Sequence, residues 1–152
     1  MLFYLVAGFI VAVDQITKWL IRVYVEIGEK LVWRGIEMTH YENSGMARSM
    51  FPGYARLFGV VAVLFVIGVI VYRRRGAMRG VLADCALGFL VGGAAGNAID
   101  RLLFGQVTDF LLTRSGGILN LADHAIEIGV GLMLLYGAVQ LYRSKVRPKP
   151  RT

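Results

Sequence analysis

The sequence predicts a small integral membrane protein built mainly from α-helices. Of its 152 residues, 57% are hydrophobic and only 18% are charged, and the mean hydropathy is +0.61. Such a chain is too apolar for one soluble domain. Each crossing of a bilayer takes about 20 mostly apolar residues. Stretches of that kind occur at residues 2–22, 54–72, 81–99 and 122–142, so we expect one domain of four transmembrane helices over 1–142.

Clusters of basic residues predict how this domain is oriented. The net charge is +7, and most of the excess falls in the loop after the second stretch and in the tail at 143–152. These residues are Arg73, Arg74, Arg75 and Arg79, and then Arg143, Lys145, Arg147, Lys149 and Arg151. Because basic segments stay in the cytoplasm, we expect both termini inside and loops 23–53 and 100–121 outside. We interpret these basic groups as setting the topology and contacting anionic lipid head groups. We therefore expect membrane lipids, and not nucleic acid, as their partners.

The first stretch contains an aspartate and a lysine in the segment "DQITK". Asp14 and Lys18 are four residues apart, so they share one helix face and can form a pair. Ionisable groups at this depth usually face a bundle interior or a water-filled cavity. The pair either holds the bundle together, in which case breaking it costs several kcal/mol, or takes a direct part in catalysis.

The first outer loop predicts a small β-element at the membrane surface. Residues that favour strands are mixed there with residues that favour turns. The first group is Leu31, Val32, Trp33, Ile36, Met38 and Tyr41, and the second is Gly35, Asn43, Ser44 and Gly45.

The third stretch combines close packing with a polar outer end. Gly88, Gly92 and Gly96 recur at intervals of four, which permits close helix contact. The segment "GNAIDR" then brings Asn97, Asp100 and Arg101 together at the outer end of the helix. Asn97 and Arg101 can satisfy helix-end carbonyls or can hold a peptide backbone, and the sequence leaves both alternatives open.

The segment "VTDFLLTRSGGILNLAD", residues 107–123, carries an aspartate near each end. Taken singly, Asp109 can be a turn residue, and Asp123 can be a carboxylate stabilised by a helix N-terminus that Asn120 caps. Taken together, they can share one proton, so that one acts on a water as general base while the other polarises a carbonyl. Glu127, one turn beyond Asp123, either raises the pKa of Asp123 or faces another helix.

Other chemistries lack the residues that they need. The single cysteine, Cys85, excludes an internal disulfide, and no third metal ligand accompanies His40 and His124. The rival from another class is a small proton- or ion-conducting transporter, because intramembrane carboxylates also mark ion pathways. Against it, the polar groups gather at the outer ends of the helices. A non-catalytic lipid-interacting or assembly protein would leave the paired aspartates without purpose.

Five segments resemble, in order and approximate spacing, the signature segments of the lipoprotein signal peptidases, also called signal peptidase II. The segments are "DQITK" (14–18), "NSGMA" (43–47), "GNAIDR" (96–101), "GQVTDF" (105–110) and "LNLAD" (119–123). The resemblance implies a monomeric aspartic endopeptidase of the bacterial cytoplasmic membrane, active on its extracytoplasmic side. Its substrates are diacylglyceryl-modified prolipoproteins, which it cuts before the lipid-modified cysteine.

The same resemblance implies a fold and a set of site residues. The fold is four transmembrane helices with a small extracytoplasmic β-cradle and a short surface helix, and no metal or cofactor is implied. The catalytic pair falls on Asp109 and Asp123. The substrate-binding residues fall on Asn43, Asn97, Arg101 and Asn120, and the residues that support the site fall on Asp14, Lys18 and Asp100.

Three departures from the family pattern concern the cradle. Arg48 stands where an aromatic residue is usual, Leu119 stands where phenylalanine is usual, and the loop over residues 110–119 is short. We expect these differences to affect substrate preference and the surface helix, and not the two aspartates.

Overall fold

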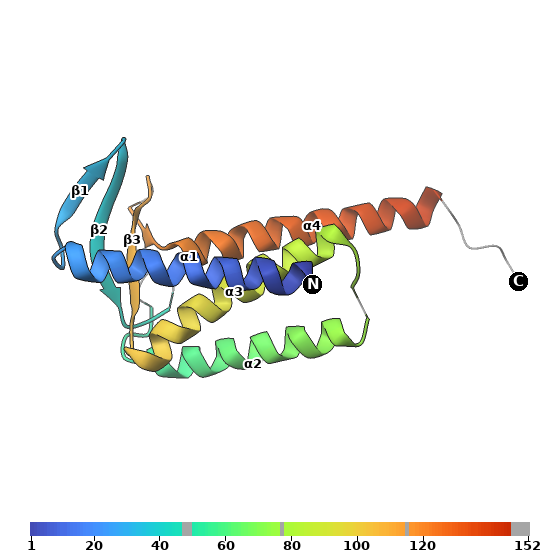
Figure 1. Cartoon of the computed structure of the whole chain (residues 1–152), viewed down its shortest axis with the longest axis horizontal. Helices are drawn as coiled ribbons and strands as arrows, with labels where there is room; N and C mark the ends of the chain where they lie inside the picture. The colour runs from blue at the N-terminus through green and yellow to red at the C-terminus, as the bar shows by residue number, and fades with distance from the viewer. Residues whose placement is uncertain (47–49, 77, 115, 147–152) are drawn as a thin grey trace, which may run out of the picture.

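The computed structural model describes residues 1–46, 50–76, 78–114 and 116–146, and these form a helical bundle with a small sheet at one end (Figure 1). The helices are α1 (Leu2–Tyr24), α2 (Ala55–Arg74), α3 (Val81–Leu103) and α4 (Leu121–Val146). The strands are β1 (Lys30–Trp33), β2 (Ile36–Asn43), β3 (Val107–Leu112) and β4 (Ile118–Leu119). All four helices are long and apolar enough to cross a membrane. The predicted fold class is therefore confirmed.

All four helices continue past the C-terminal ends of the apolar stretches that predict them. Apolar composition marks only the part of a helix inside the hydrocarbon core, about 30 Å thick, whereas backbone hydrogen bonding continues into the head-group region. At 1.5 Å per residue, the 23 residues of α3 span about 35 Å. Helix α4 continues through Arg143 and Lys145 to Val146, so the start of the expected basic tail is helical. Residues 147–152 lie outside the described residues.

Helix α3 occupies the centre of the bundle, with α1, α2 and α4 packed around it. In α3, 61% of the apolar window is buried, compared with 11–17% in the other three helices. Glycines make this packing possible. A Cβ atom on Gly92 would lie 2.7 Å from the Cβ of Ile10 in α1, and one on Gly129 of α4 would lie 2.7 Å from the Cγ of Leu90 in α3. The close helix contact predicted from the glycine spacing is thus confirmed.

The four strands form one antiparallel sheet in the order β1-β2-β3-β4. The two-residue turn between β1 and β2 has φ of 51° at Arg34 and 83° at Gly35, as a type I′ turn requires. The β-element predicted in the first outer loop is confirmed in these two strands. The pairing of β2 with β3 then joins the two outer loops, with Tyr41 opposite Asp109 and Asn43 opposite Val107.

The segment after β3 returns at once as a hairpin. Leu111 pairs with Leu119 and Leu112 with Ile118, and the Thr113 N–H donates to the Gly117 carbonyl at 2.8 Å. The short surface helix implied by the resemblance has no counterpart among the described residues, which leave out Ser115. The short segment between Asp109 and Asn120 contains the end of β3 and all of β4, which leaves too few residues for a surface helix. As a result, Asn120 is brought back beside Asp109.

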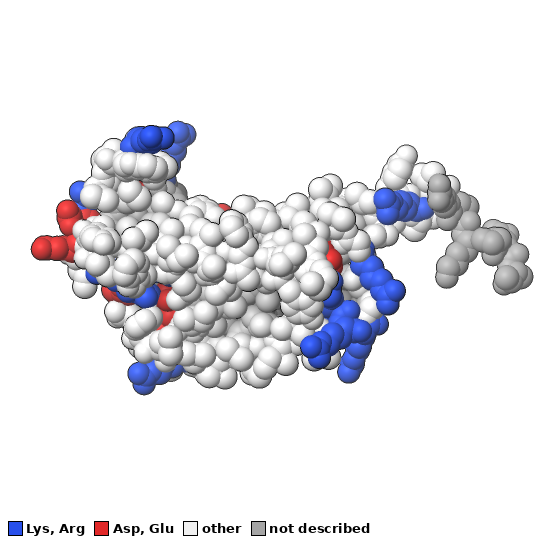
Figure 2. All heavy atoms as spheres, viewed as in Figure 1, with Lys and Arg blue, Asp and Glu red and all other residues white. Residues whose placement is uncertain are grey.

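Charged groups lie at the two ends of the molecule, with an apolar belt between them (Figure 2). Arginines gather around the loop that connects α2 to α3, at the end away from the sheet. At the sheet end, acidic and basic residues are mixed. Many large apolar side chains on the belt are exposed, including Leu64, Leu134 and Phe9. A belt of this kind is what a lipid-facing surface requires.

Candidate active site

Lys18 lies in a fully buried ionic cluster at the sheet end of the bundle. Its Nζ atom lies 2.9 Å from Oδ2 of Asp14 and 3.0 Å from Oδ2 of Asp100, and neither carboxylate is exposed. The same atom donates to Oδ1 of Asn97 at 2.8 Å. The pair predicted within "DQITK" therefore forms, and it includes a second aspartate from α3.

The remaining oxygens of this cluster tie α1 to α3 and α4. Oδ1 of Asp14 accepts from the Ala122 N–H at 2.9 Å, in the first turn of α4. Gln15 donates to Asp14 and Asp100 at 3.2 Å each, and Arg22 forms an ion pair with Asp100 at 2.8 Å. Buried carboxylates are stable only when such donors surround them. The cluster therefore fixes the start of α4 relative to the other two helices.

Asp109 projects from β3 and is 3% exposed. Its Oδ2 accepts from the Asn43 amide at 3.0 Å, and its Oδ1 accepts from the Asn120 amide at 2.6 Å. Burial raises the pKa of Asp109 to about 6, against the effect of the two amides, and the nearby charge of Asp123 adds to the rise. Near neutral pH this carboxyl can therefore both hold and release a proton.

Asp123 lies in the first turn of α4, where it forms a reciprocal cap with Asn120. The Asn120 N–H donates to Oδ2 of Asp123 at 3.2 Å, and the Asp123 N–H donates to Oδ1 of Asn120 at 3.0 Å. This is the arrangement of a capping box, so the predicted helix cap is confirmed. The other oxygen of Asp123 accepts from the Asn97 amide at 2.8 Å. Asn120 thus contacts both aspartates.

The two aspartates line one cavity of about 570 Å³. Its polar lining includes Asn43, Asn97, Arg101, Asp109, Asn120 and Asp123. The opposite wall is apolar and comes from α2, α3 and α4, with Phe58, Val61, Phe65, Leu90, Ala94 and Ile126. The Nε atom of Arg101 is buried without a hydrogen-bond partner among the described residues. The cavity therefore offers two carboxyls, one uncommitted donor and a long apolar surface.

The candidate residues divide into two groups by position. The six polar residues of the cavity lining come together, whereas Asp14, Lys18 and Asp100 are buried behind Asn97 and do not line the cavity. Glu127 also lines it, but is exposed and bonded to His124 at 3.0 Å. Leu119 lies in the lining, and Arg48 lies outside the described residues.

A polar chain that the sequence did not reveal attaches the sheet to α1. The Arg22 Nε donates to the Thr108 hydroxyl at 2.7 Å, and this hydroxyl donates to Oε1 of Glu42 at 2.8 Å. His40 contacts the same oxygen at 2.8 Å and the Val25 carbonyl at 2.7 Å. Alternation along a strand places His40 and Glu42 on one face, but their partners follow only from the strand register.

Comparisons with known proteins agree with one another over almost the whole chain. A family model described as Signal peptidase (SPase) II matches residues 6–139. A lipoprotein signal peptidase of Anoxybacillus flavithermus is 39% identical over 142 residues, covering 90% of this chain and 84% of that protein. One of Listeria monocytogenes serotype 4a is 40% identical over 152 residues, covering 95% of this chain and 98% of that protein.

Two solved structures share the fold. A bacterial membrane enzyme solved at 2.3 Å resolution has a TM-score of 0.83 and 28% identity, and covers 97% of this chain and 92% of that one. A second bacterial membrane enzyme, solved at 1.9 Å, has a TM-score of 0.77 and 31% identity, with coverages of 87% and 89%.

Proposed function

This chain belongs to the signal peptidase II family, whose members remove signal peptides from prolipoproteins, and we propose that Asp109 and Asp123 perform this hydrolysis here. The observation that carries the proposal is the position of Asn120, which contacts both aspartates in the wall of one cavity. The alternative of a proton- or ion-conducting transporter is not supported by the comparisons.

The proposed chemistry needs one proton shared between the two carboxyls. The ionised member accepts a proton from a water molecule, whose oxygen attacks the carbonyl carbon of the scissile peptide, while the protonated member donates to the carbonyl oxygen. The C–N bond then breaks: the leaving nitrogen takes the proton that the base removed from water, and the proton on the former carbonyl oxygen returns to the carboxylate that donated it. A pKa of Asp109 near 6 suits both roles, and the shared proton belongs to the coupled pair.

The polar residues of the lining have different tasks in this proposal. The amides of Asn43, Asn97 and Asn120 already donate to the aspartates, so we assign them to holding the carboxyls in position. The Arg101 Nε has no partner among the described residues. A guanidinium is a donor only, so Arg101 is the residue that we assign to a carbonyl of the substrate backbone.

The apolar wall suits the signal segment and the lipid chains of the substrate. Helices α2 and α4 each pack against α3 without an extensive contact between them. Val61 and Phe65 line the cavity, yet are 55% and 45% exposed. The wall therefore continues into the lipid-facing surface, and we propose that a diacylglyceryl-modified precursor enters sideways between α2 and α4.

The charge distribution supports a topology for this enzyme. The arginine-rich loop between α2 and α3 lies at the end of the bundle opposite the sheet (Figures 1 and 2). By the positive-inside rule, we place that loop and both termini in the cytoplasm and the two aspartates on the extracytoplasmic side. Because one chain supplies all the residues of the cavity, we propose that the enzyme acts as a monomer.

The test is cleavage of a lipidated precursor by the purified protein. We expect Asp109→Asn and Asp123→Asn each to lower turnover by about a thousandfold or more, with helix content retained in circular dichroism. Glu127→Gln is the matched control, because Glu127 lines the same cavity but bonds to His124, and it should stay close to the wild type. Substantial turnover by either aspartate variant would exclude the proposed pair.

A further inference from the structure

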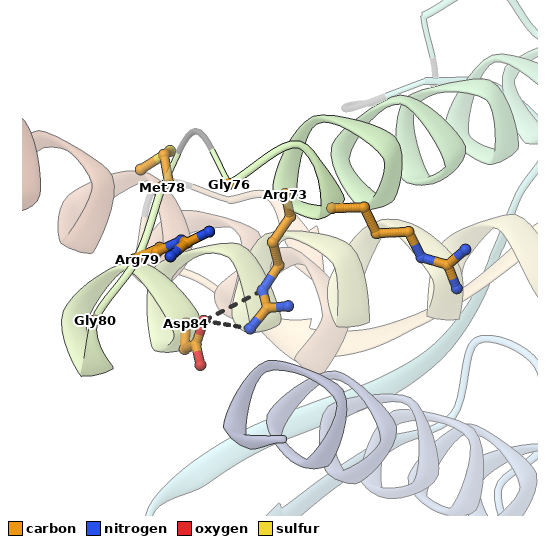
Figure 3. A pocket seen from close by; sticks show the side chains of 7 residues that line it. Arg73, Gly76, Met78, Arg79, Gly80 and Asp84 are labelled. Carbon is orange, nitrogen blue, oxygen red and sulfur yellow. Dashed lines mark hydrogen bonds and ion pairs between the residues drawn. The ribbon is translucent and has the colours of Figure 1, made fainter.

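A second cavity lies at the end of the bundle away from the aspartates, where the loop between α2 and α3 turns back (Figure 3). Its volume is about 370 Å³. Its lining consists of Arg73, Arg74, Gly76, Met78, Arg79, Gly80 and Asp84. Three arginines and a single aspartate therefore line this cavity.

Arg73 and Asp84 neutralise each other. The Arg73 Nε and one terminal nitrogen lie 3.2 and 2.7 Å from the same Oδ1 atom of Asp84, as Figure 3 shows. The Arg73 guanidinium also lies 4.7 Å from the centre of the Phe3 ring, which adds a cation–π contact. Arg73 is thus fixed as one wall of the cavity, and its positive charge is compensated by Asp84.

Arg74 and Arg79 remain as uncompensated charges. Within the described part of the chain, no acidic side chain pairs with either of them. Arg79 folds back over Gly76, where a Cβ atom would lie 2.7 Å from its guanidinium. Gly76 also has φ of 76°, a conformation that favours glycine. The absence of a side chain at Gly76 therefore lets the Arg79 guanidinium lie against the loop, beside the cavity.

The backbone adds to the positive potential. Helix α3 begins after Gly80, and no side chain of the described residues caps its N-terminus. The first N–H groups of a helix carry a partial positive charge and attract anions. Together with the arginines, this N-terminus makes the cavity complementary to phosphate, which guanidinium groups bind through paired hydrogen bonds.

The surroundings indicate that the phosphate belongs to a lipid. The cavity lies at the ends of two helices that are long and apolar enough to cross a membrane, where head groups are found. The centre of the Tyr4 ring lies 5.6 Å from the Arg73 guanidinium. Tyr72 and Val81 are chain neighbours of the lining residues Arg73 and Gly80. The exposed fractions of Tyr4, Tyr72 and Val81 are 46%, 52% and 71%. Such side chains suit the interfacial part and the first carbons of an acyl chain.

From these observations we propose that the cavity binds the phosphodiester head group of an anionic phospholipid. The lipid phosphate contacts Arg74 and Arg79, while its chains lie along the apolar surface beside α2 and α3. This site is far from Asp109 and Asp123 and does not depend on the peptidase assignment. It would anchor the loop at the membrane surface and fix the ends of α2 and α3 relative to each other.

The test is a lipid titration of the full chain in detergent, with bound phospholipid counted by native mass spectrometry. We expect one phosphatidylglycerol to bind more tightly than phosphatidylcholine. Arg74→Gln with Arg79→Gln should weaken phosphatidylglycerol binding by about tenfold to thirtyfold. Arg143→Gln with Lys145→Gln is the matched control, because it removes two charges from the last turn of α4, and it should change binding by less than about threefold.

A charge-neutral variant separates the shape of the site from its charge. Gly76→Ala displaces the Arg79 guanidinium without altering net charge, so phosphatidylglycerol binding should weaken while helix content is retained. Because φ at Gly76 is positive, the alanine should also lower the free energy of unfolding, which thermal melts would measure separately from lipid affinity. If both double variants lost the same affinity for phosphatidylglycerol, binding would depend on diffuse surface charge and the proposal would be wrong. An unchanged affinity in Gly76→Ala would also overturn it. Displacement of the lipid by soluble glycerol phosphate would assign the cavity to a soluble phosphate compound instead.

Discussion

Asn120 donates a 2.6 Å hydrogen bond from its amide to Oδ1 of Asp109. The carbonyl oxygen of the same side chain accepts from the backbone of Asp123. One amide therefore links a carboxyl on a strand to the first turn of a helix, and the relative position of the two carboxyls depends on it.

Replacing Asn120 should alter the pH dependence of cleavage separately from stability. Asn120→Asp keeps an acceptor for the helix cap, but removes the donor to Asp109 and adds a negative charge beside it. Both changes raise the pKa of Asp109, so the acid limb of kcat/KM should move upward by about one pH unit or more. Asn120→Ala also loses the cap and should lower the free energy of unfolding by about 1 kcal/mol.

Rate profiles against pH and thermal melts of both variants distinguish these effects. An acid limb that stays in place in Asn120→Asp would show that Asn120 acts on the helix alone.

The pKa of Asp109 also predicts how stability depends on pH. Burial raises this pKa from 3.8 to about 6 in the folded chain, so the folded state binds the proton more tightly than the unfolded state. The stabilisation from that proton is complete below about pH 4 and is lost as the pH rises through about 6. The free energy of unfolding of the wild type, relative to that of Asp109→Asn, should therefore fall by up to about 3 kcal/mol between about pH 4 and pH 7.

Parallel unfolding curves of the two proteins across this range measure the difference, in which the other carboxyls cancel. A difference that does not change with pH would contradict a raised pKa at Asp109.

The buried ionic cluster should dominate the stability of the sheet end. Lys18→Met leaves Asp14 and Asp100 buried without the ammonium that lies about 3 Å from both, and should lower the free energy of unfolding by about 3–5 kcal/mol. Asp14→Asn combined with Lys18→Met should lose less than the sum of the single changes, because the two residues are coupled.

Lys30→Met, at an exposed position of β1, is the control for loss of a lysine and should stay within about 0.5 kcal/mol of the wild type. Denaturant unfolding in detergent provides the comparison. Similar losses for the two lysines would show that the cluster contributes little.

Close packing of α3 against α4 should be needed for activity as well as stability. A Cβ atom on Gly93 would collide with the Ala122 carbonyl oxygen and lie 2.8 Å from Cγ1 of Ile126. Gly93→Ala must therefore push the start of α4 away, together with Asp123. We expect this substitution to lower the free energy of unfolding by about 1–3 kcal/mol and to lower kcat/KM.

Gly131→Ala serves as the control within α4, because a Cβ there has nothing within 4 Å. Gly131→Ala should leave the free energy of unfolding unchanged or raise it by up to about 1 kcal/mol. If Gly93→Ala retained wild-type kcat/KM, the position of Asp123 would not depend on this contact.

Local spacing allowed part of the site to be predicted from the residues alone. Asp14 and Lys18 are one helical turn apart, and Asn120 lies three residues before Asp123, so helix geometry fixes both relationships. The contact between Asn43 and Asp109 is different. It depends on the register of β2 with β3, which shifts between Met38 and Tyr41, and no periodic pattern reveals such a shift.

Long-range partners account for what the sequence could not show. Arg22 meets Asp100 and Thr108 across 78 and 86 positions of the chain, and neither spacing has a local signature. Strand β4 has only two residues, too few for an alternating pattern, so the hairpin after Asp109 could not be distinguished from an open loop. For Arg101, the sequence leaves two roles open, and the proposal that it binds the substrate backbone is supported by its Nε, which has no partner among the described residues.

The half-exposed wall formed by Val61 and Phe65 has a pharmacological consequence. If ligands reach the cavity from the bilayer, occupancy follows their mole fraction in the membrane and not their concentration in the buffer. An inhibitor that partitions strongly into lipid would then lose apparent potency as vesicles or detergent are added at constant dose. Inhibitors of this enzyme should therefore be ranked at a fixed ratio of compound to lipid.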